Sequence, residues 1–270
     1  NAYIVSQKPA PEGFWIALVI DAEKDWHTYW VNPGDSGLPS KIAWELPAGF
    51  RADEIQWPYP ERMEHPPLVT YGYHGRVLLP IRIHPPKGWS SATPFALKGK
   101  ASWLICQDLC LPAKEEVEWK WPNAINETLD EQTAQVAEAL SKLPQNPAQD
   151  PMLAFQAATD SARLEVSAST DSANARAARS LEFFPADSSA LDHSVELEQG
   201  SALGRHRWIR KLRAGAPARV QGVAVLFGPG DRATAWTVSL DVKPGDIPRL
   251  ETTAGADLPF RWLWMFALAF

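Results

Sequence analysis

The sequence predicts an all-β protein made of two β-sandwich domains with one short helix between them. Most apolar residues fall in short runs that are rich in β-branched and aromatic side chains and that end at turn residues. Proline and tryptophan are frequent, at 24 and 13 of 270 residues, and only one stretch has the periodicity of an amphipathic helix. A chain of this length is long for one sandwich and sufficient for two.

The first half of the chain contains several segments that are typical of strands. Each segment either alternates apolar with polar residues or is apolar throughout. The segments are residues 3–6, 14–20, 25–31, 41–46, 77–83, 95–106 and 116–121. A turn is predicted over residues 32–37, which read Asn-Pro-Gly-Asp-Ser-Gly. Residues 51–68 carry four prolines and are predicted to form a loop.

Residues 128–143 are predicted to form the helix. Thr128 and Glu131 fit a capping box, apolar residues make one stripe, and Pro144 ends the helix. The linker composition of residues 145–151 places a boundary between a domain of residues 1–144 and one of residues 152–257. The second domain repeats short strands and turns. Its predicted strands are residues 163–167, 181–185, 194–197, 206–212, 219–227 and 234–242.

The C-terminal residues 258–270 are predicted to be the start of a membrane segment. Nine uncharged apolar or aromatic residues follow Arg261, fewer than the roughly 20 that a spanning helix needs. Arg261 with Trp262 and Trp264 is typical of an interfacial anchor. The alternative is a C-terminal strand or helix that packs on the protein body. The first residue is Asn, so we expect the chain to be processed or trimmed.

Charge and ligand content argue against two classes of function. The formal net charge of −6 is spread along the chain without a basic tract, which argues against nucleic-acid binding. A zinc site would need two ligands besides the cysteines, and no histidine lies within ten residues of either cysteine. His27 and His74 could act as bases or ligands, but isolated histidines are more often structural. We therefore predict no metal and no cofactor.

Cys106 and Cys110 are the only cysteines of the chain. They lie at the tip between two predicted strands, where facing Cα atoms about 4.5–5.5 Å apart allow a disulfide. A bond that closes so short a loop removes little entropy from the unfolded chain, so it is a weak staple. We therefore interpret the pair as a reversible redox disulfide, and the alternative is an inert hairpin clip.

The sequence around the pair favours a passive exchanger that is shielded by an aromatic flap. Asp108 would if anything raise the pKa of a nearby thiol, and no helix N-terminus is evident. A more reactive thiolate on a partner is therefore expected to attack the disulfide. Tyr71, Gly72 and Tyr73 are the best candidates for the flap, because glycine gives backbone freedom and tyrosine gives bulk. An ordinary aromatic turn is the alternative.

Three segments carry a family resemblance: residues 26–39, residues 71–73, and residues 103–112 with the two cysteines. Over about residues 10–122 the chain resembles the periplasmic N-terminal (alpha) region of the DsbD/ScsB family of membrane thiol:disulfide reductases. The cysteines of DsbD are further apart, so the CxxxC spacing and the additional β domain make the chain more similar to ScsB. The resemblance implies that Cys110 forms mixed disulfides with partners, that Cys106 resolves them, and that Tyr71 and Tyr73 form the flap.

The resemblance also implies that both sandwiches are immunoglobulin-like, the first catalytic and the second a spacer or docking platform. The expected function is that of a protein-disulfide reductase in a periplasmic domain of an inner-membrane protein. It would take electrons from its own transmembrane domain and reduce periplasmic thioredoxin-fold proteins, such as an ScsC-like isomerase or a peroxidase relay. Two alternatives are a non-enzymatic binding or adhesion module with a structural disulfide, and a copper-binding module that uses Cys106, Cys110 and a His or Met.

Overall fold

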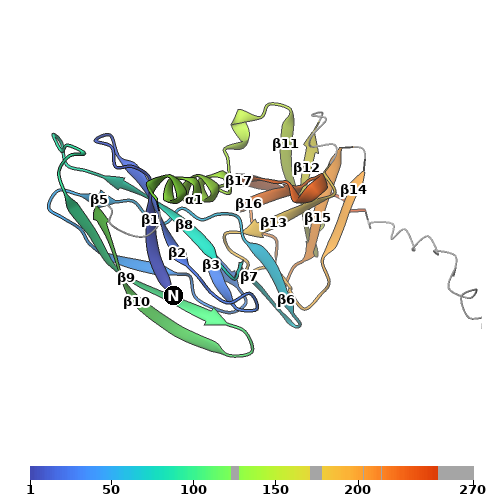
Figure 1. The fold of residues 1–270 in the computed structure, drawn as a ribbon. Coiled ribbons are helices and arrows are strands. Elements are labelled where there is room, and N and C mark those ends of the chain that lie inside the picture. The colour runs from blue at the N-terminus through green and yellow to red at the C-terminus, as the bar shows by residue number, and fades with distance from the viewer. Residues whose placement is uncertain (123–127, 171–177, 203, 214, 249–270) are drawn as a thin grey trace, which may run out of the picture.

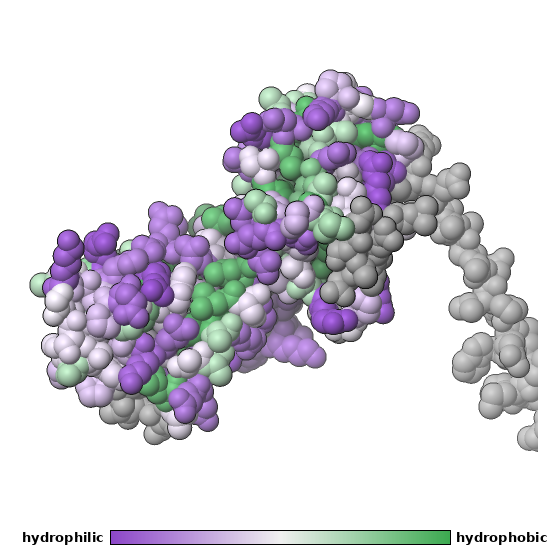
Figure 2. All heavy atoms as spheres, turned by 90° about the horizontal axis from the view of Figure 1, so that it is seen from above, coloured by the Kyte–Doolittle hydropathy of each residue, from purple (hydrophilic) through white to green (hydrophobic). Residues whose placement is uncertain are grey.

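The computed structural model describes residues 1–122, 128–170, 178–202, 204–213 and 215–248. They form two β-rich bodies with one helix beside the junction (Figure 1). We call residues 1–122 the first body and residues 153–248 the second body. Seen from above, hydrophilic side chains cover most of the outer edges, and hydrophobic side chains gather toward the middle of the molecule (Figure 2). The prediction of an all-β protein of immunoglobulin-like sandwich type is confirmed.

The first body is a sandwich of two sheets. One sheet has the order β1 (Ala2–Ser6), β2 (Phe14–Ile20), β8 (Val77–His84) and β5 (Arg51–Ala52). The other has the order β10 (Cys110–Trp121), β9 (Phe95–Cys106), β3 (His27–Gly34), β7 (Leu68–His74) and β6 (Glu61–His65), with β4 (Lys41–Glu45) paired to β9. The sequence alternation along β10 decides which side faces the core, since Val117 and Trp119 are buried whereas Glu116 and Glu118 are exposed.

The helix α1 (Leu129–Ser141) covers the outer side of the four-stranded sheet. Its N-terminus has the predicted capping box between Thr128 and Glu131. Val136 and Ala139 are buried and pack against apolar residues of β1, β2 and β8. Gln132 is also buried, and its side-chain oxygen accepts a hydrogen bond from Trp119 Nε1 over 3.1 Å. This contact fixes the helix to the edge of the core of the first body.

The second body is one seven-stranded sheet that folds over on itself. Its order is β13 (Ser180–Pro185), β16 (Arg219–Phe227), β17 (Ala233–Pro244), β11 (Leu153–Thr159), β12 (Arg163–Thr170), β15 (Arg205–Lys211) and β14 (Glu198–Ala202). The two ends meet, because the rings of Phe183 on β13 and Trp208 on β15 lie 5.4 Å apart. Gln199 on β14 also donates to the carbonyl of Leu181 over 2.8 Å. The folded sheet thus encloses its own apolar core.

Two local predictions were wrong. Residues 51–68 were predicted to form a loop, but they contain β5 and β6. Pro60 and Pro66 flank β6 and do not interrupt it, and pairing with β7 stabilises the strand. Residues 194–197 were predicted to form a strand, but β14 begins at Glu198. Within the described ranges, no helix is long and apolar enough to span a membrane. The predicted membrane segment, residues 258–270, lies outside the described residues.

The two bodies share part of one hydrophobic core. Phe184 of the second body packs between Trp30 and Tyr71 of the first body, with ring centroids 6.2 and 5.5 Å away. The connecting segment also pairs with the second body, since Gln145 N donates to Ala235 O over 2.8 Å. The bodies therefore meet through packed side chains and backbone hydrogen bonds, and not only through a linker.

Candidate redox site

Cys106 and Cys110 form a disulfide at the end of a long β-hairpin. Cys106 is the last residue of β9, Cys110 is the first residue of β10, and the two face each other in the antiparallel register. Their sulfurs are bonded at 2.05 Å, and their Cα atoms lie 4.2 Å apart. The predicted position of the pair between two strands is confirmed. Because both strands continue away from the cysteines as one paired ladder, the backbone holds the sulfurs together.

The two cysteines differ in their access to solvent. Cys106 is only 1% exposed, whereas Cys110 belongs to an exposed stretch that begins at Gln107. Leu109 in this stretch is 68% exposed, and Leu111 beside Cys110 is also exposed. An attacking group from outside can therefore approach the disulfide from the side of Cys110, past an apolar surface.

Tyr29 on β3 has a polar side chain that contacts both sulfurs. Its hydroxyl donates to Cys106 Sγ over 2.9 Å and lies 3.3 Å from Cys110 Sγ. Burial raises the pKa of Tyr29, and a side-chain hydrogen bond with Ser36 lowers it in part. The phenol therefore keeps its proton at neutral pH and can donate it in a hydrogen bond to sulfur.

Gly37 makes room for the Tyr29 ring. It has a φ of 103°, and a Cβ atom at this position would lie 2.3 Å from a carbon of the ring. The turn predicted at residues 32–37 is shorter in the structure, because β3 continues through Gly34 and the chain turns at Asp35 and Ser36. Gly37, which follows this turn, packs directly against the Tyr29 ring, and the hydroxyl of that ring contacts the sulfurs.

The structure brings Cys106 and Cys110 together but places Tyr71 and Tyr73 elsewhere. His27 lies opposite Cys106, so His27 and Tyr29 point to the disulfide face of the sheet. Tyr73 lies opposite Thr28, so Tyr73 and Tyr71 point to the core face. In the part of the chain that the structure describes, neither tyrosine of the expected flap makes a hydrogen bond to a sulfur. The aromatic hydroxyl at the disulfide belongs to Tyr29 instead.

The Tyr71-Gly72-Tyr73 motif has structural partners on the core face. The Tyr73 hydroxyl donates to Pro58 O over 2.8 Å, and the Tyr71 ring packs on Phe184. Gly72 lies opposite Tyr29, and a Cβ atom there would lie 1.9 Å from the carbonyl oxygen of Thr28. Glycine at this position therefore allows β3 and β7 to pair closely.

Three histidines lie close together on the disulfide face, and one of them, His27, lies opposite Cys106. The ring of His27 is 5.2 Å from Tyr29, 5.9 Å from His74 and 6.2 Å from His65. Burial lowers the pKa of His27, and the charges of His74 and His65 lower it further. Among the residues that the structure describes, no set of three or more His, Cys, Asp or Glu side chains is arranged to hold a metal ion.

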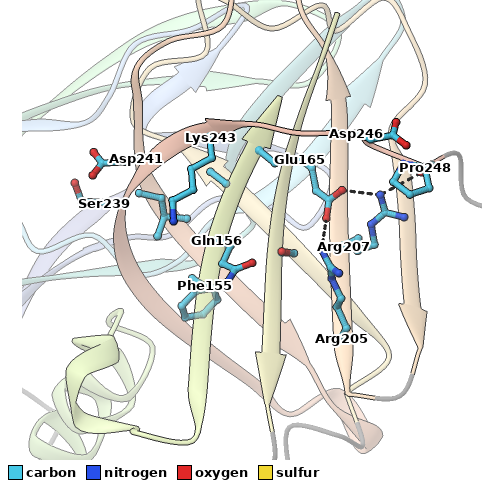
Figure 3. Close-up of a pocket in the computed structure, with 14 residues that line it drawn as sticks. Phe155, Gln156, Glu165, Arg205, Arg207, Ser239, Asp241, Lys243, Asp246 and Pro248 are labelled. Carbon is cyan, nitrogen blue, oxygen red and sulfur yellow. Dashed lines mark hydrogen bonds and ion pairs between the residues drawn. The ribbon is translucent and has the colours of Figure 1, made fainter. Parts of the chain in front are cut away.

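A separate cavity of about 560 Å³ lies in the second body, which contains no cysteine. Figure 3 shows Glu165 on its wall, joined to both Arg205 and Arg207. Glu165 is almost completely buried, and its oxygens lie 3.1 and 2.6 Å from the guanidinium groups of Arg205 and Arg207. These ion pairs satisfy the buried carboxylate. This cavity is not part of the redox site.

Sequence reasoning missed Tyr29. It lies in residues 25–31, which were predicted to form a strand without a decision on which face each side chain occupies. The signal was the alternation itself, because the residue that shares a face with His27 is Tyr29. Without the pairing of His27 with Cys106, however, neither face could be assigned to the sulfurs.

Comparisons with known proteins agree with this site. Residues 1–122 match the family model described as the N-terminal region of thiol:disulfide interchange protein DsbD. No curated protein was found to match the sequence. Among solved structures, the N-terminal periplasmic domain of ScsB from Proteus mirabilis matches with a TM-score of 0.66 at 15% sequence identity. The match covers 88% of this chain and 92% of that chain.

Two further matches are too distant to support an argument. The periplasmic chaperone SfaE has a TM-score of 0.21 at 8% identity, covering 90% of this chain and 96% of that chain. The major pilin subunit BcpA of Bacillus cereus has a TM-score of 0.22 at 8% identity, covering 92% and 71%. The family match together with the Cys106–Cys110 disulfide supports a thiol:disulfide exchange module. Residues 1–122 are thus similar to the N-terminal region of DsbD, and the chain shares the fold of the ScsB periplasmic domain.

Proposed function

We propose that this chain is the periplasmic electron-relay module of a membrane thiol:disulfide reductase. Its cysteine pair takes two electrons from a membrane-embedded domain of the same protein and passes them to a disulfide of a periplasmic thioredoxin-fold partner. The asymmetry of the pair carries the proposal. Cys110 is exposed at the hairpin tip, whereas Cys106 is buried beside Tyr29, as one attacking and one resolving cysteine require.

The transfer consists of two exchange steps. In the reduced protein, the Cys110 thiolate attacks one sulfur of the partner disulfide, and the other partner sulfur leaves as a thiolate. The Cys106 thiolate then attacks Cys110 Sγ, so that the mixed disulfide breaks and the second partner sulfur leaves. The pair loses two electrons, the partner gains them, and the two protons released by the cysteine thiols balance those that the partner thiolates take up.

Tyr29 has two roles in this proposal. In the reduced state its hydroxyl donates a hydrogen bond to the buried sulfur, and a hydrogen bond to a charged group typically contributes about 1.5–3 kcal/mol. The buried ring also covers Cys106, so we assign the shielding of the reduced pair to Tyr29 and not to Tyr71 and Tyr73. The exposed side chains of Leu109 and Leu111 offer a partner an apolar contact next to Cys110.

The same proposal divides the chain into functional parts. Residues 1–144 are the exchange domain, residues 152–257 are the second sandwich, and residues 258–270 begin a membrane segment that links the module to its electron source. The partner class includes an ScsC-like isomerase or a peroxidase relay. The shared fold with the ScsB periplasmic domain supports the division of the chain into two β domains.

A trapping experiment tests the proposal. The Cys106→Ala variant is reduced and mixed with an oxidised, purified thioredoxin-fold protein, and non-reducing electrophoresis detects the product. A mixed disulfide through Cys110 is expected to accumulate, because no resolving sulfur remains. The matched Cys110→Ala variant is expected to form little. Equal trapping by both variants would contradict the assignment of Cys110 as the attacking cysteine. No trapping by either variant, or a wild-type reduction potential below about −300 mV, would support a structural clip instead.

A further inference from the structure

The segment Asn32–Gly37 lies between the disulfide and the second body. We propose that the second body positions Tyr29 at the sulfurs through this segment, with His193 as the positioning residue, and so sets the redox equilibrium of the Cys106–Cys110 pair. The inference rests on the proposed exchange function. It gives the second body a role in the chemistry, although that body contains no cysteine.

Two side-chain hydrogen bonds tie the segment to the second body. His193 Nδ1 lies 2.7 Å from Asp35 Oδ2, and the side chain of His193 is completely buried. Asn32 Nδ2 donates to Pro185 O over 2.7 Å. Arg213 adds a longer ion pair to the other oxygen of Asp35, at 3.6 Å. The segment is therefore held at two separate points by residues that lie outside the first body.

The His193–Asp35 contact has a defined chemistry. Burial lowers the pKa of His193 despite the nearby Asp35 carboxylate, so the ring is neutral at neutral pH. A neutral ring carries one proton, and the proton on Nδ1 donates to the carboxylate as a charge-assisted hydrogen bond. The other nitrogen, Nε2, lies 3.5 Å from the Tyr71 hydroxyl. Asp35 also accepts from Val69 N over 2.8 Å, which aligns its carboxylate.

The other side of the same segment holds Tyr29. The side chain of Ser36, the residue after Asp35, lies close enough to the phenol to lower the pKa of Tyr29. Gly37 lies against the Tyr29 ring so closely that it has no space for a side chain. A displacement of the segment therefore displaces the phenol, whose hydroxyl is 2.9 Å from Cys106 Sγ. Three consecutive residues thus connect His193 of the second body to the disulfide.

Loosening this segment is expected to shift the redox equilibrium of the Cys106–Cys110 pair in one direction, toward the disulfide. The Tyr29 hydroxyl favours the reduced form, since a thiolate accepts a stronger hydrogen bond than a disulfide sulfur does. A loosened segment weakens that bond and shifts the pair toward the disulfide. We expect His193→Phe, which keeps a ring and removes the donor, to lower the equilibrium constant for reduction by glutathione about two- to fivefold.

The experiment measures this constant in the full chain across a series of glutathione redox buffers. The conservative variant His193→Asn, whose amide can still donate to Asp35, is expected to retain a value near wild type. The decisive comparison is a double variant. In a Tyr29→Phe background, His193→Phe is expected to have no further effect, because its influence passes through the missing hydroxyl.

A second variant keeps the inference testable if His193→Phe fails to fold. Asn32→Asp retains the oxygen that accepts from Gly34 N and loses the nitrogen that donates to Pro185. It is expected to lower the same constant, and again only when Tyr29 is present. An unchanged constant in these variants, or an equal decrease with and without the Tyr29 hydroxyl, would overturn the inference. Because glutathione replaces the protein partner, this result is separate from the trapping experiment.

Discussion

The two bodies of this protein hold their polar groups in different ways. In the second body, Glu165 is enclosed by Arg205 and Arg207 beside a cavity of about 560 Å³, and its charge is fully paired. In the first body, the reactive group is a disulfide at a hairpin tip, with the hydroxyl of Tyr29 as its polar neighbour. The exchange site needs access more than enclosure.

The largest effect is expected from a substitution at the disulfide, which lies in the first body and has no counterpart in the second. Replacing Cys110 by Ala removes the thiolate that we propose attacks the partner, so electron transfer to an oxidised thioredoxin-fold protein is expected to fall to background. The fold is expected to remain, because a disulfide that closes so short a loop contributes only about 2 kcal/mol in the chain-entropy account. Partner reduction and thermal unfolding of the same preparations measure both quantities. Loss of fold together with loss of transfer would indicate a structural clip.

The next largest effect tests whether the bodies form one packed unit. Phe184→Ala removes the ring that packs on Trp30 and Tyr71, and we expect a loss of about 3–5 kcal/mol in the free energy of unfolding. Urea unfolding measures the change. Phe155→Ala is the control, because Phe155 is only partly buried and lies in the second body alone. A loss below about 1 kcal/mol for Phe184→Ala would show that the bodies are energetically independent.

A smaller effect is expected from the hydroxyl at the sulfurs. Tyr29→Phe removes a hydrogen bond that is stronger to the reduced sulfur than to the disulfide sulfur. With a difference of about 1 kcal/mol between the two states, the equilibrium constant for reduction by glutathione is expected to fall about fivefold. Tyr73→Phe is the matched control, since it removes a buried hydroxyl that bonds to Pro58 O on the core face of the same sheet. The control is expected to lose stability and keep its equilibrium constant. The same decrease in both variants would contradict a specific role for Tyr29.

The smallest effect concerns pH. Because the pKa of His27 is lowered in the folded protein, the unfolded state binds a proton that the native state does not as pH falls through about 6.5. The contribution of His27 to stability is therefore present at higher pH and lost on acidification. We expect His27→Gln to flatten the dependence of the unfolding free energy on pH between about 7.5 and 5.5. If the unfolding free energy of His27→Gln depends on pH in the same way as that of the wild type, in buffers of equal ionic strength, His27 does not contribute to this dependence.

The hairpin that carries the redox pair could be predicted from the sequence. The run that ends at Cys106 has the apolar and β-branched composition of a strand, and strict alternation from Glu116 to Trp121 defines the next strand. The capping box at Thr128 likewise predicted where the helix begins. These features depend on residues that are close in sequence, so local patterns were sufficient.

The surroundings of the sulfurs could not be predicted in the same way. Tyr29 reaches the disulfide because β3 pairs with both β7 and β9. These pairings join strands that are far apart in the sequence. A register different by one residue would have turned Tyr29 to the core and exchanged the faces of Tyr71 and Gly72. The contact between Asp35 and His193 is still more distant, since 158 residues separate them.

The ladder between β9 and β10 has a final consequence. The cysteines are its terminal pair, and eleven further residue pairs, from Leu111 with Ile105 to Trp121 with Phe95, continue the register. We therefore expect the backbone pairing to remain when the sulfur bridge opens, so that the oxidised and reduced molecules have nearly the same shape. A partner must then distinguish the two redox states by whether the sulfurs react with it, and not by a difference in the shape of the surface.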